Sequence, residues 1–368
     1  MPELEKVFAG QRGRRSCAVC ERYSFLVSEA LGLCPVCAKT LGGQAQAREA
    51  HERSRRRFHL PEAPPRSRGG VSCGECAAEC VIGDGERGYC GLRTAEDGKL
   101  IQLAGTPDRG LLHWYREGLP TNCVADGDCG GARNPDMHNL AVYYASCTLD
   151  CLYCHNWRFR DLDPRRSSGT SAEDLAEQAN VRTYCACFFG GDPASQMPHA
   201  IASAKLLVEK GVTVCWETAG TASPKLIDQA AGLSLESGGR LKIDLKAFTS
   251  PLHVALTGLD NRRTLDNFAR LARRFRDRPG ALLVASTVLV PGYVDPEEVG
   301  RIASFIAQQD PGIPYTLLAF SPGYLMTDLP RTSAMHAEEA RQAALAAGLQ
   351  HVRIGNRHLL GAGYPEAI

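Results

Sequence analysis

The feature that most constrains this chain is a group of three cysteines, Cys147, Cys151 and Cys154, at the spacing C-x3-C-x2-C. They follow the apolar run Leu140–Tyr144, which predicts that a buried strand leads into one tight cysteine loop. Thiolates are the usual ligands of iron–sulfur clusters, and three of them can hold three corners of a cubic cluster. The fourth iron is then open to a substrate or cofactor. The pattern indicates a reactive cluster, with a partial zinc site or a chance group of buried thiols as alternatives.

The composition places the chain among globular metalloproteins. Of its 368 residues, 44% are hydrophobic and 23% charged, which suffices for a sizeable core and for more than one domain. A net charge of +1 does not favour nucleic acid or a membrane surface as a partner. The apolar run 281–290 is too short to span a bilayer, and the charged first fifteen residues do not resemble a signal peptide. Sixteen cysteines in short-spaced groups indicate metal binding in a reducing compartment, so we expect a cytoplasmic protein.

Residues 1–43 are predicted to form a zinc ribbon. Two C-x2-C pairs, Cys17 with Cys20 and Cys34 with Cys37, are separated by a spacer typical of such ribbons. Each pair supplies two corners of a closed tetrahedral site, which is structural rather than catalytic. A rubredoxin-like iron site is the competing interpretation.

Residues 44–69 are predicted to form a basic helix followed by a linker. The segment Gln44–Arg57 is polar and helical in pattern and ends in four closely spaced arginines, whereas Pro61–Arg68 lacks a core pattern. The basic run could contact RNA or an acidic partner. A solvated helix face is the simpler interpretation.

Residues 70–137 contain a second cysteine group, and we expect it to hold an auxiliary [4Fe–4S] cluster. Its members are Cys73, Cys76, Cys80 and Cys90. Several glycines surround the last thiol, as expected where backbone folds closely around a cluster. Four ligands make a closed site, and a second zinc is the alternative. Cys123 and Cys129 cannot form a cluster alone; they either complete or shield a site or are free thiols.

Residues 138–368 alternate between strand and helix patterns. Six short apolar segments without polar alternation are typical of a parallel sheet that is covered on both faces. They are Leu140–Ala145, Thr183–Phe189, Val212–Thr218, Arg240–Lys246, Ala281–Leu289 and Pro314–Phe320. Ser171 and Asp295 have the pattern of helix caps. Six units are too few for an eight-fold barrel, so we predict an α/β fold with a partial (β/α)6 barrel.

In such a fold, the carboxyl ends of the strands carry the active site. The second strand ends in Gly190-Gly191-Asp192, where the glycines allow close approach of a ligand and the exposed carbonyl groups can accept hydrogen bonds from an amine. The same residues also suit an ordinary turn.

The third and fourth strands end in polar side chains. Glu217 and Thr218 can bind sugar hydroxyl groups. Asp244 and Lys246 share one face of their strand, and their burial is costly unless they pair or bind a charged ligand such as an amino acid moiety. A structural ion pair at the end of the sheet is the alternative.

The order of these motifs resembles the pyruvate formate-lyase-activating-enzyme branch of the radical S-adenosylmethionine (SAM) superfamily. Further segments are similar to the AmmeMemoRadiSam-system subgroup. These are Cys80–Ile82, Arg87–Gly91, Thr257–Asn261, Val290–Tyr293, Leu318–Tyr324 and Ile354–His358. The likeness covers about residues 70–365, and the zinc ribbon departs from it.

The resemblance implies a set of cofactor-binding roles. Cys147, Cys151 and Cys154 would bind the [4Fe–4S] cluster that holds SAM, and Tyr153 would lie near the adenine. Gly190, Gly191 and Asp192 replace the family's Gly-Gly-Glu, which receives the methionine amine. The residues expected to line the SAM or cation site are Glu217, Thr218, Asp244 and Lys246. Ser286 or Thr287 stands where relatives often have a basic residue, so Lys246 is the expected partner of the methionine carboxylate.

The implied function is reductive cleavage of SAM to a 5′-deoxyadenosyl radical, which abstracts hydrogen from a small-molecule or protein substrate. Such an enzyme needs an electron donor such as flavodoxin or ferredoxin. One alternative is an activase that places a glycyl radical on a partner enzyme. Another, from a different class, is a zinc-ribbon module that binds RNA or protein.

Overall fold

The computed structural model describes residues 13–121, 123–125, 127, 129–276 and 282–364. The first twelve residues of the predicted ribbon and Ala281, the first residue of the predicted fifth strand, lie outside this part.

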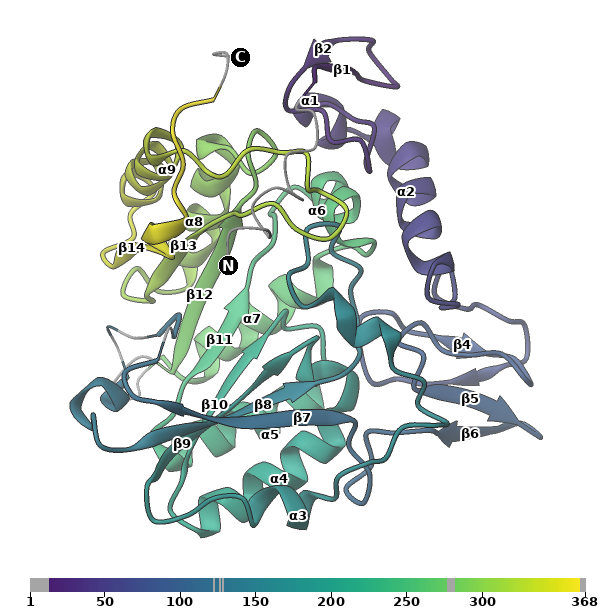
Figure 1. Cartoon of the computed structure of the whole chain (residues 1–368), viewed down its shortest axis with the longest axis vertical. Coiled ribbons are helices and arrows are strands. Elements are labelled where there is room, and N and C mark those ends of the chain that lie inside the picture. The colour runs from purple at the N-terminus through teal and green to yellow at the C-terminus, as the bar shows by residue number, and fades with distance from the viewer. Residues whose placement is uncertain (1–12, 122, 126, 128, 277–281, 365–368) are drawn as a thin grey trace, which may run out of the picture.

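An eight-stranded sheet dominates the described part of the chain (Figure 1), in the order β14-β13-β12-β11-β10-β9-β8-β7. The strands are β7 (Leu112–Gly118), β8 (His138–Tyr144), β9 (Thr183–Gly190), β10 (Thr213–Thr218), β11 (Leu241–Asp244), β12 (Leu283–Leu289), β13 (Tyr315–Ala319) and β14 (Val352–Gly355). Strands β8 to β14 run parallel and in sequence order, and β7 pairs antiparallel with β8. All six predicted strands are confirmed, and the fold is the expected partial α/β barrel.

Two edge strands were not predicted. Strand β7 alternates between half-buried and exposed residues, and all four residues of β14 are half-buried. Each pairs on one side only, so neither has the continuous apolar run of a central strand. Because β7 lies in the segment assigned to the auxiliary region, the sheet begins before the predicted boundary at residue 138.

Helices between the strands cover the outer face of the sheet (Figure 1). They are α3 (Ala172–Ala176), α4 (Met197–Glu209), α5 (Pro224–Ser237), α6 (Ser250–Thr257), α7 (Arg262–Arg274), α8 (Pro296–Gln309) and α9 (Ala334–Ala346). The predicted caps are confirmed, because the Ser171 and Asp295 side chains accept hydrogen bonds from the third residues of α3 and α8. The core fills the space between sheet and helices; Trp216, for example, is fully buried and stacks on Phe188 at 4.6 Å between ring centroids.

The amino-terminal part lies along one side of the barrel (Figure 1). It consists of β1 (Arg15–Ser16), β2 (Tyr23–Ser24), α1 (Pro35–Ala38), the 3-10 helix η1 (Leu41–Gly43) and α2 (Gln44–Arg56). Two small hairpins follow, formed by β3 (Val71–Ser72) with β4 (Val81–Ile82) and by β5 (Arg93–Glu96) with β6 (Lys99–Gln102). In the part of the chain described here, no helix combines the length and the apolar character needed to cross a membrane.

Candidate active site at the carboxyl ends of the strands

The three-cysteine loop leaves the end of β8 and is anchored to helix α6. Ser146 adopts a left-handed conformation, with φ of 78°, where the chain turns out of the strand. The Asp150 amide donates to the Thr257 carbonyl at 2.8 Å, and the Leu152 amide donates to the Leu256 carbonyl at 3.1 Å. These contacts fix the loop from outside, while its thiols face a cavity.

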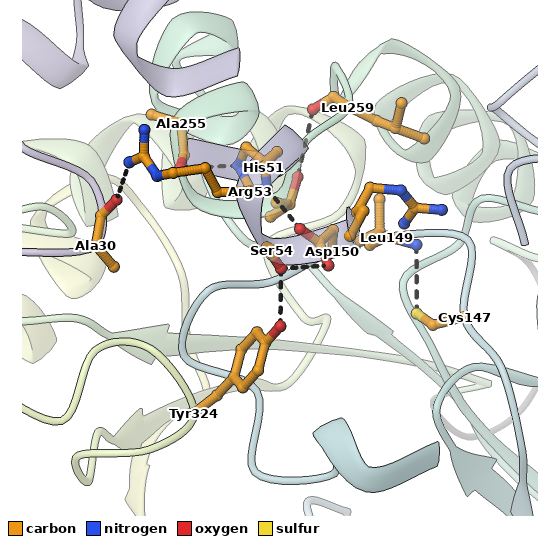
Figure 2. Close-up of polar contacts among 12 residues, drawn as sticks. Ala30, His51, Arg53, Ser54, Cys147, Leu149, Asp150, Ala255, Leu259 and Tyr324 are labelled. Atoms are coloured by element: carbon orange, nitrogen blue, oxygen red, sulfur yellow. Dashed lines mark hydrogen bonds and ion pairs between the residues drawn. The ribbon is translucent and has the colours of Figure 1, made fainter. Parts of the chain in front are cut away.

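Asp150, the residue before Cys151, joins this loop to helix α2 (Figure 2). Its carboxylate lies 2.9 Å from His51 Nδ1 and accepts a hydrogen bond from Ser54 Oγ at 3.1 Å. Arg160, in the 3-10 helix η4 (Trp157–Asp161), forms an ion pair with it at 3.0 Å. Burial disfavours a charged carboxylate, but the His51 and Arg160 contacts hold the pKa of Asp150 below its usual value. The loop is thus braced by an element outside the barrel.

Helix α2, the predicted basic helix, is not solvated over its polar face as the simpler interpretation held. His51, Ser54 and Arg55 are buried. The Arg55 guanidinium donates to the carbonyl groups of Pro61 and Tyr89 and lies over the Tyr89 ring. A single arginine in this run therefore connects the helix, the linker and the auxiliary region, which a charge count cannot reveal.

One cavity of about 1430 Å³ opens at the carboxyl ends of the strands, and every residue predicted to be catalytic or cofactor-binding lines it. These residues are Cys147, Cys151, Tyr153, Cys154, Gly190, Gly191, Asp192, Glu217, Thr218, Asp244 and Lys246. They come from four consecutive strands whose carboxyl ends meet at one edge of the sheet, as the barrel geometry requires.

Gly190 and Gly191, at the end of β9, allow close packing against the backbone that leads into the cysteine loop. A Cβ atom on Gly191 would lie 1.9 Å from the Ser146 carbonyl oxygen, and one on Gly190 would lie 2.6 Å from the Tyr144 nitrogen. Gly190 also has φ of +113°, which favours glycine. The close approach inferred from the sequence is thus an approach to the backbone that leads into the cysteine loop. The Gly190 carbonyl accepts a hydrogen bond from Asn156 Nδ2 at 3.0 Å.

Asp192 and Thr218 tie two strand ends together. The Asp192 carboxylate accepts hydrogen bonds from Thr218 Oγ1 at 2.7 Å and from the amides of Ala194 and Ala219 at 2.8 and 2.9 Å. Burial raises the pKa of Asp192 in spite of these donors. Both side chains are therefore engaged in hydrogen bonds that hold the cavity wall together.

Asp244 and Lys246 form an ion pair of 2.5 Å at the end of β11. Burial opposes both charges, but their mutual attraction holds the pKa of Asp244 below and that of Lys246 well above the usual values. Ser286, on the neighbouring strand, donates to Asp244. Both groups are charged, and both line the cavity.

Lys242 is a further buried charge that the sequence analysis missed. Its side chain is 2% exposed and forms an ion pair with Glu217 on the adjacent strand. Side chains two residues apart along a strand lie on the same face. This rule, which predicted that Asp244 and Lys246 share a face, applies equally to Lys242 and Asp244.

The thiols of the loop fit an iron–sulfur cluster. Burial raises the pKa of Cys151 to about 12 and that of Cys147 well above its usual value, so without metal both are neutral. Metal binding replaces those protons, and the three neighbouring thiols of the loop are a suitable ligand set. No other thiol of the described residues lines this cavity, which leaves one cluster corner for a bound ligand.

The four ribbon cysteines fit a single metal ion. The sulfur atoms of Cys17, Cys20, Cys34 and Cys37 all lie within 4.8 Å of one another. Tetrahedral coordination at about 2.3 Å places sulfur atoms about 3.8 Å apart, and the distance from Cys20 to Cys34 is 3.6 Å. The ribbon docks on the barrel through the Tyr293 hydroxyl, which donates to the Leu33 carbonyl at 2.7 Å.

The second cysteine group lines a small cavity of its own beside the loop. Arg93 is buried next to it, pairs with Glu75 and donates to the Cys90 sulfur at 3.8 Å. Ser146, which precedes the first loop cysteine, donates to the Cys90 carbonyl at 2.8 Å. The two thiol groups are therefore neighbours in space, although more than fifty residues separate them in sequence.

Comparison with known proteins agrees with this geometry. The sequence profile of the radical SAM superfamily matches residues 142–306. The pyruvate formate-lyase-activating enzyme of Staphylococcus aureus is 31% identical over 181 residues, which are 46% of this chain and 69% of that enzyme. The chain belongs to the radical SAM superfamily. Membership makes it an enzyme and implies SAM and one [4Fe–4S] cluster as cofactors.

Two further proteins are similar to this radical SAM enzyme. The pyruvate formate-lyase 1-activating enzyme of Escherichia coli is 25% identical over 178 residues, 46% of this chain and 68% of that enzyme. An uncharacterized protein of Methanocaldococcus jannaschii is 24% identical over 304 residues, 78% of this chain and 81% of that protein. The second likeness extends far beyond the part shared with the activating enzymes.

Proposed function

We propose that this radical SAM enzyme cleaves SAM reductively and abstracts a hydrogen atom from a small-molecule or protein substrate. The observation that carries the proposal is the single cavity at the strand ends, which brings three loop thiols together with the Asp244–Lys246 pair. When bound, the reduced cluster supplies one electron that breaks a C–S bond of SAM and yields a 5′-deoxyadenosyl radical.

The chain's own side chains bind and orient the cofactor in this proposal. Lys246 contacts the methionine carboxylate, and the backbone at Gly190 and Gly191 receives the methionine amine. Tyr153 is buried, packs edge-on against Phe320 at 6.3 Å and presents an aromatic wall for the adenine. The cavity walls limit access of water to the reactive carbon.

The other two thiol groups have supporting roles. We assign an auxiliary [4Fe–4S] cluster to Cys73, Cys76, Cys80 and Cys90, because their cavity adjoins the loop through the Ser146–Cys90 contact. An electron donor such as flavodoxin or ferredoxin reduces the enzyme, and this cluster relays electrons or binds substrate. The ribbon holds a structural zinc. A cytoplasmic location, where reductants are available, stays a prediction.

The decisive experiment is anaerobic reconstitution followed by addition of SAM and dithionite. We expect 5′-deoxyadenosine, measured by liquid chromatography and mass spectrometry, and none from Cys154→Ala. Cys17→Ser is a control for general damage, because it alters the distant zinc ribbon and should affect folding more than cleavage per loaded cluster. Absence of 5′-deoxyadenosine from a fully loaded wild-type enzyme would contradict the proposal.

A glycyl-radical-enzyme activase is the second candidate, because pyruvate formate-lyase-activating enzymes are among its relatives. An activase should generate a glycyl radical on a partner enzyme, visible as a doublet by electron paramagnetic resonance. The cysteines of the auxiliary region precede the barrel, whereas activases with extra cysteines usually carry them between strands. No contact in the described residues favours an RNA-binding module, since Arg55 of the basic run is buried inside the protein.

A further inference from the structure

Five cysteines belong to none of the three thiol groups described above, yet all five line one second cavity of about 860 Å³. They are Cys123, Cys129, Cys185, Cys187 and Cys215. The sequence divides them into two loop thiols of uncertain use and three thiols on strands, and only the fold brings them together.

The three strand cysteines share the inner face of the sheet. Cys185 and Cys187 are two residues apart on β9, so their side chains point to the same side. Cys215 is in register with Cys187 on the adjacent strand β10. All three are at least 91% buried, and Glu217, two residues after Cys215, extends the same face toward the SAM cavity.

The connection from β7 to β8 carries the other two thiols across the barrel. The Val124 carbonyl accepts hydrogen bonds from Thr316 of β13 and from Arg353 of β14. These strands lie at the opposite edge of the sheet from β7, so Val124 contacts the far edge of the sheet. Cys123 and Cys129 are half-buried and face the strand cysteines.

A buried cation accompanies the thiols. Lys242 Nζ lies 3.5 Å from the Cys123 sulfur and forms an ion pair with Glu217. A lysine next to thiols stabilises their thiolate form, which is the form that binds metal. Core cysteines normally pack against apolar atoms, whereas these five surround a cavity that is also lined by Glu217, the ion-pair partner of Lys242.

The spacing favours a polynuclear group over one ion. Among the described residues, the four ribbon thiols are the group whose ligand atoms converge within 4.8 Å, and no three of the five cysteines here do so. Thiolates of an iron–sulfur cluster bind different iron atoms and are therefore spread around the cluster.

We propose that this cavity binds a further iron–sulfur cluster through four thiolates, those of Cys123, Cys129 and two of the three strand cysteines. Glu217 and Phe189 line both this cavity and the SAM cavity, which places the cluster directly next to the SAM site. The proposal concerns binding and does not depend on which substrate the enzyme uses.

Iron, sulfide and zinc counts per chain test the proposal in the anaerobically reconstituted full-length protein. Clusters at the loop and auxiliary groups account for about eight irons, and a third cubic cluster raises the expected total to about twelve. The double variant Cys123→Ser/Cys129→Ser should lose about four irons and four sulfides while retaining its zinc. Cys20→Ser is the matched control, because it should lose zinc and keep all its iron.

Several outcomes would overturn the proposal. A wild-type total of about eight irons together with a single zinc would do so whatever the variant's folding, because the loop and auxiliary groups then account for all the iron. So would an unchanged iron content in the folded double variant, a second zinc that this variant loses, or a disulfide between these cysteines, detected by mass spectrometry of the loaded protein. Circular dichroism of the double variant distinguishes loss of a cluster from loss of fold.

Discussion

Replacing Asp150 with alanine should destabilise this enzyme more than removal of any surface carboxylate. The carboxylate is fully buried and holds three elements together. It connects the cysteine loop to His51 and Ser54 of α2 (Figure 2). It also pairs with Arg160 of η4. In Asp150→Ala, the Arg160 side chain, which is 1% exposed, is left as a buried charge that has lost its carboxylate partner.

The structure sets the size of this effect. Breaking a buried ion pair by removing one partner costs about 3–5 kcal/mol. The lost hydrogen bonds from Ser54 and His51 contribute about 1 kcal/mol each, but they overlap with the first figure because all three contacts share one carboxylate. Arg160 still stacks on the Phe159 and Tyr324 rings, at 4.6 and 4.9 Å. We therefore expect a loss of about 4 kcal/mol for Asp150→Ala and of about 2 kcal/mol for Asp150→Asn, which retains one acceptor oxygen.

Urea unfolding followed by circular dichroism, at one fixed cofactor loading, measures these losses. The matched control is Asp228→Ala, because Asp228 also pairs with two arginines but lies at the surface, where about 0–1 kcal/mol is expected. Iron content provides a second measurement, since a displaced loop should retain less iron. Equal losses for Asp150→Ala and Asp228→Ala would refute the inference that α2 braces the cysteine loop.

Three further predictions concern pH, packing and cofactor affinity. Burial lowers the pKa of His253 from 6.5 to about 4, so the neutral imidazole stabilises the fold above pH 6.5. About 2 kcal/mol of the unfolding free energy is therefore lost between pH 7.5 and 5, and His253→Gln should remove this part of the pH dependence. Gly191→Ala should displace the cysteine loop and reduce the retained iron by half or more, because the new Cβ would lie 1.9 Å from a backbone oxygen. The control Gly232→Ala places its Cβ in open space and should leave the stability unchanged or raise it by up to about 1 kcal/mol. Lys246→Ala should weaken equilibrium binding of SAM about tenfold or more, because one charge-assisted hydrogen bond is lost. An unchanged affinity would show that Lys246 does not bind SAM.

Most of the barrel could be predicted from the sequence because its central strands are buried on both faces. Such strands have short, continuous apolar runs, and all six were recognised. Edge strands β7 and β14 were missed because solvent on one side allows polar residues. The helix caps at Ser171 and Asp295 were recognised because a cap is a local contact within four residues.

The limits of sequence reasoning are clearest at helix α2. Its arginines suggested a solvated face, but the structure buries Arg55 and directs His51 and Ser54 at the cysteine loop. Burial of a charged residue depends on partners that lie far along the chain, such as Tyr89 and Asp150. No local pattern contains that information.

The sequence alone determined the elements with short-range causes: the spacing of Cys147, Cys151 and Cys154, the two thiol pairs of the ribbon, and the strand ends that line one cavity. The thiol groups can be recognised from residue type and spacing within a few positions. The shared location of the strand ends follows from the rule that parallel strands present their carboxyl ends at one edge of the sheet. Only the tertiary structure decided which distant groups meet. It placed the auxiliary thiols beside the loop and gathered the five remaining cysteines around one cavity, because the path of a connection across a sheet is set by packing of the whole chain.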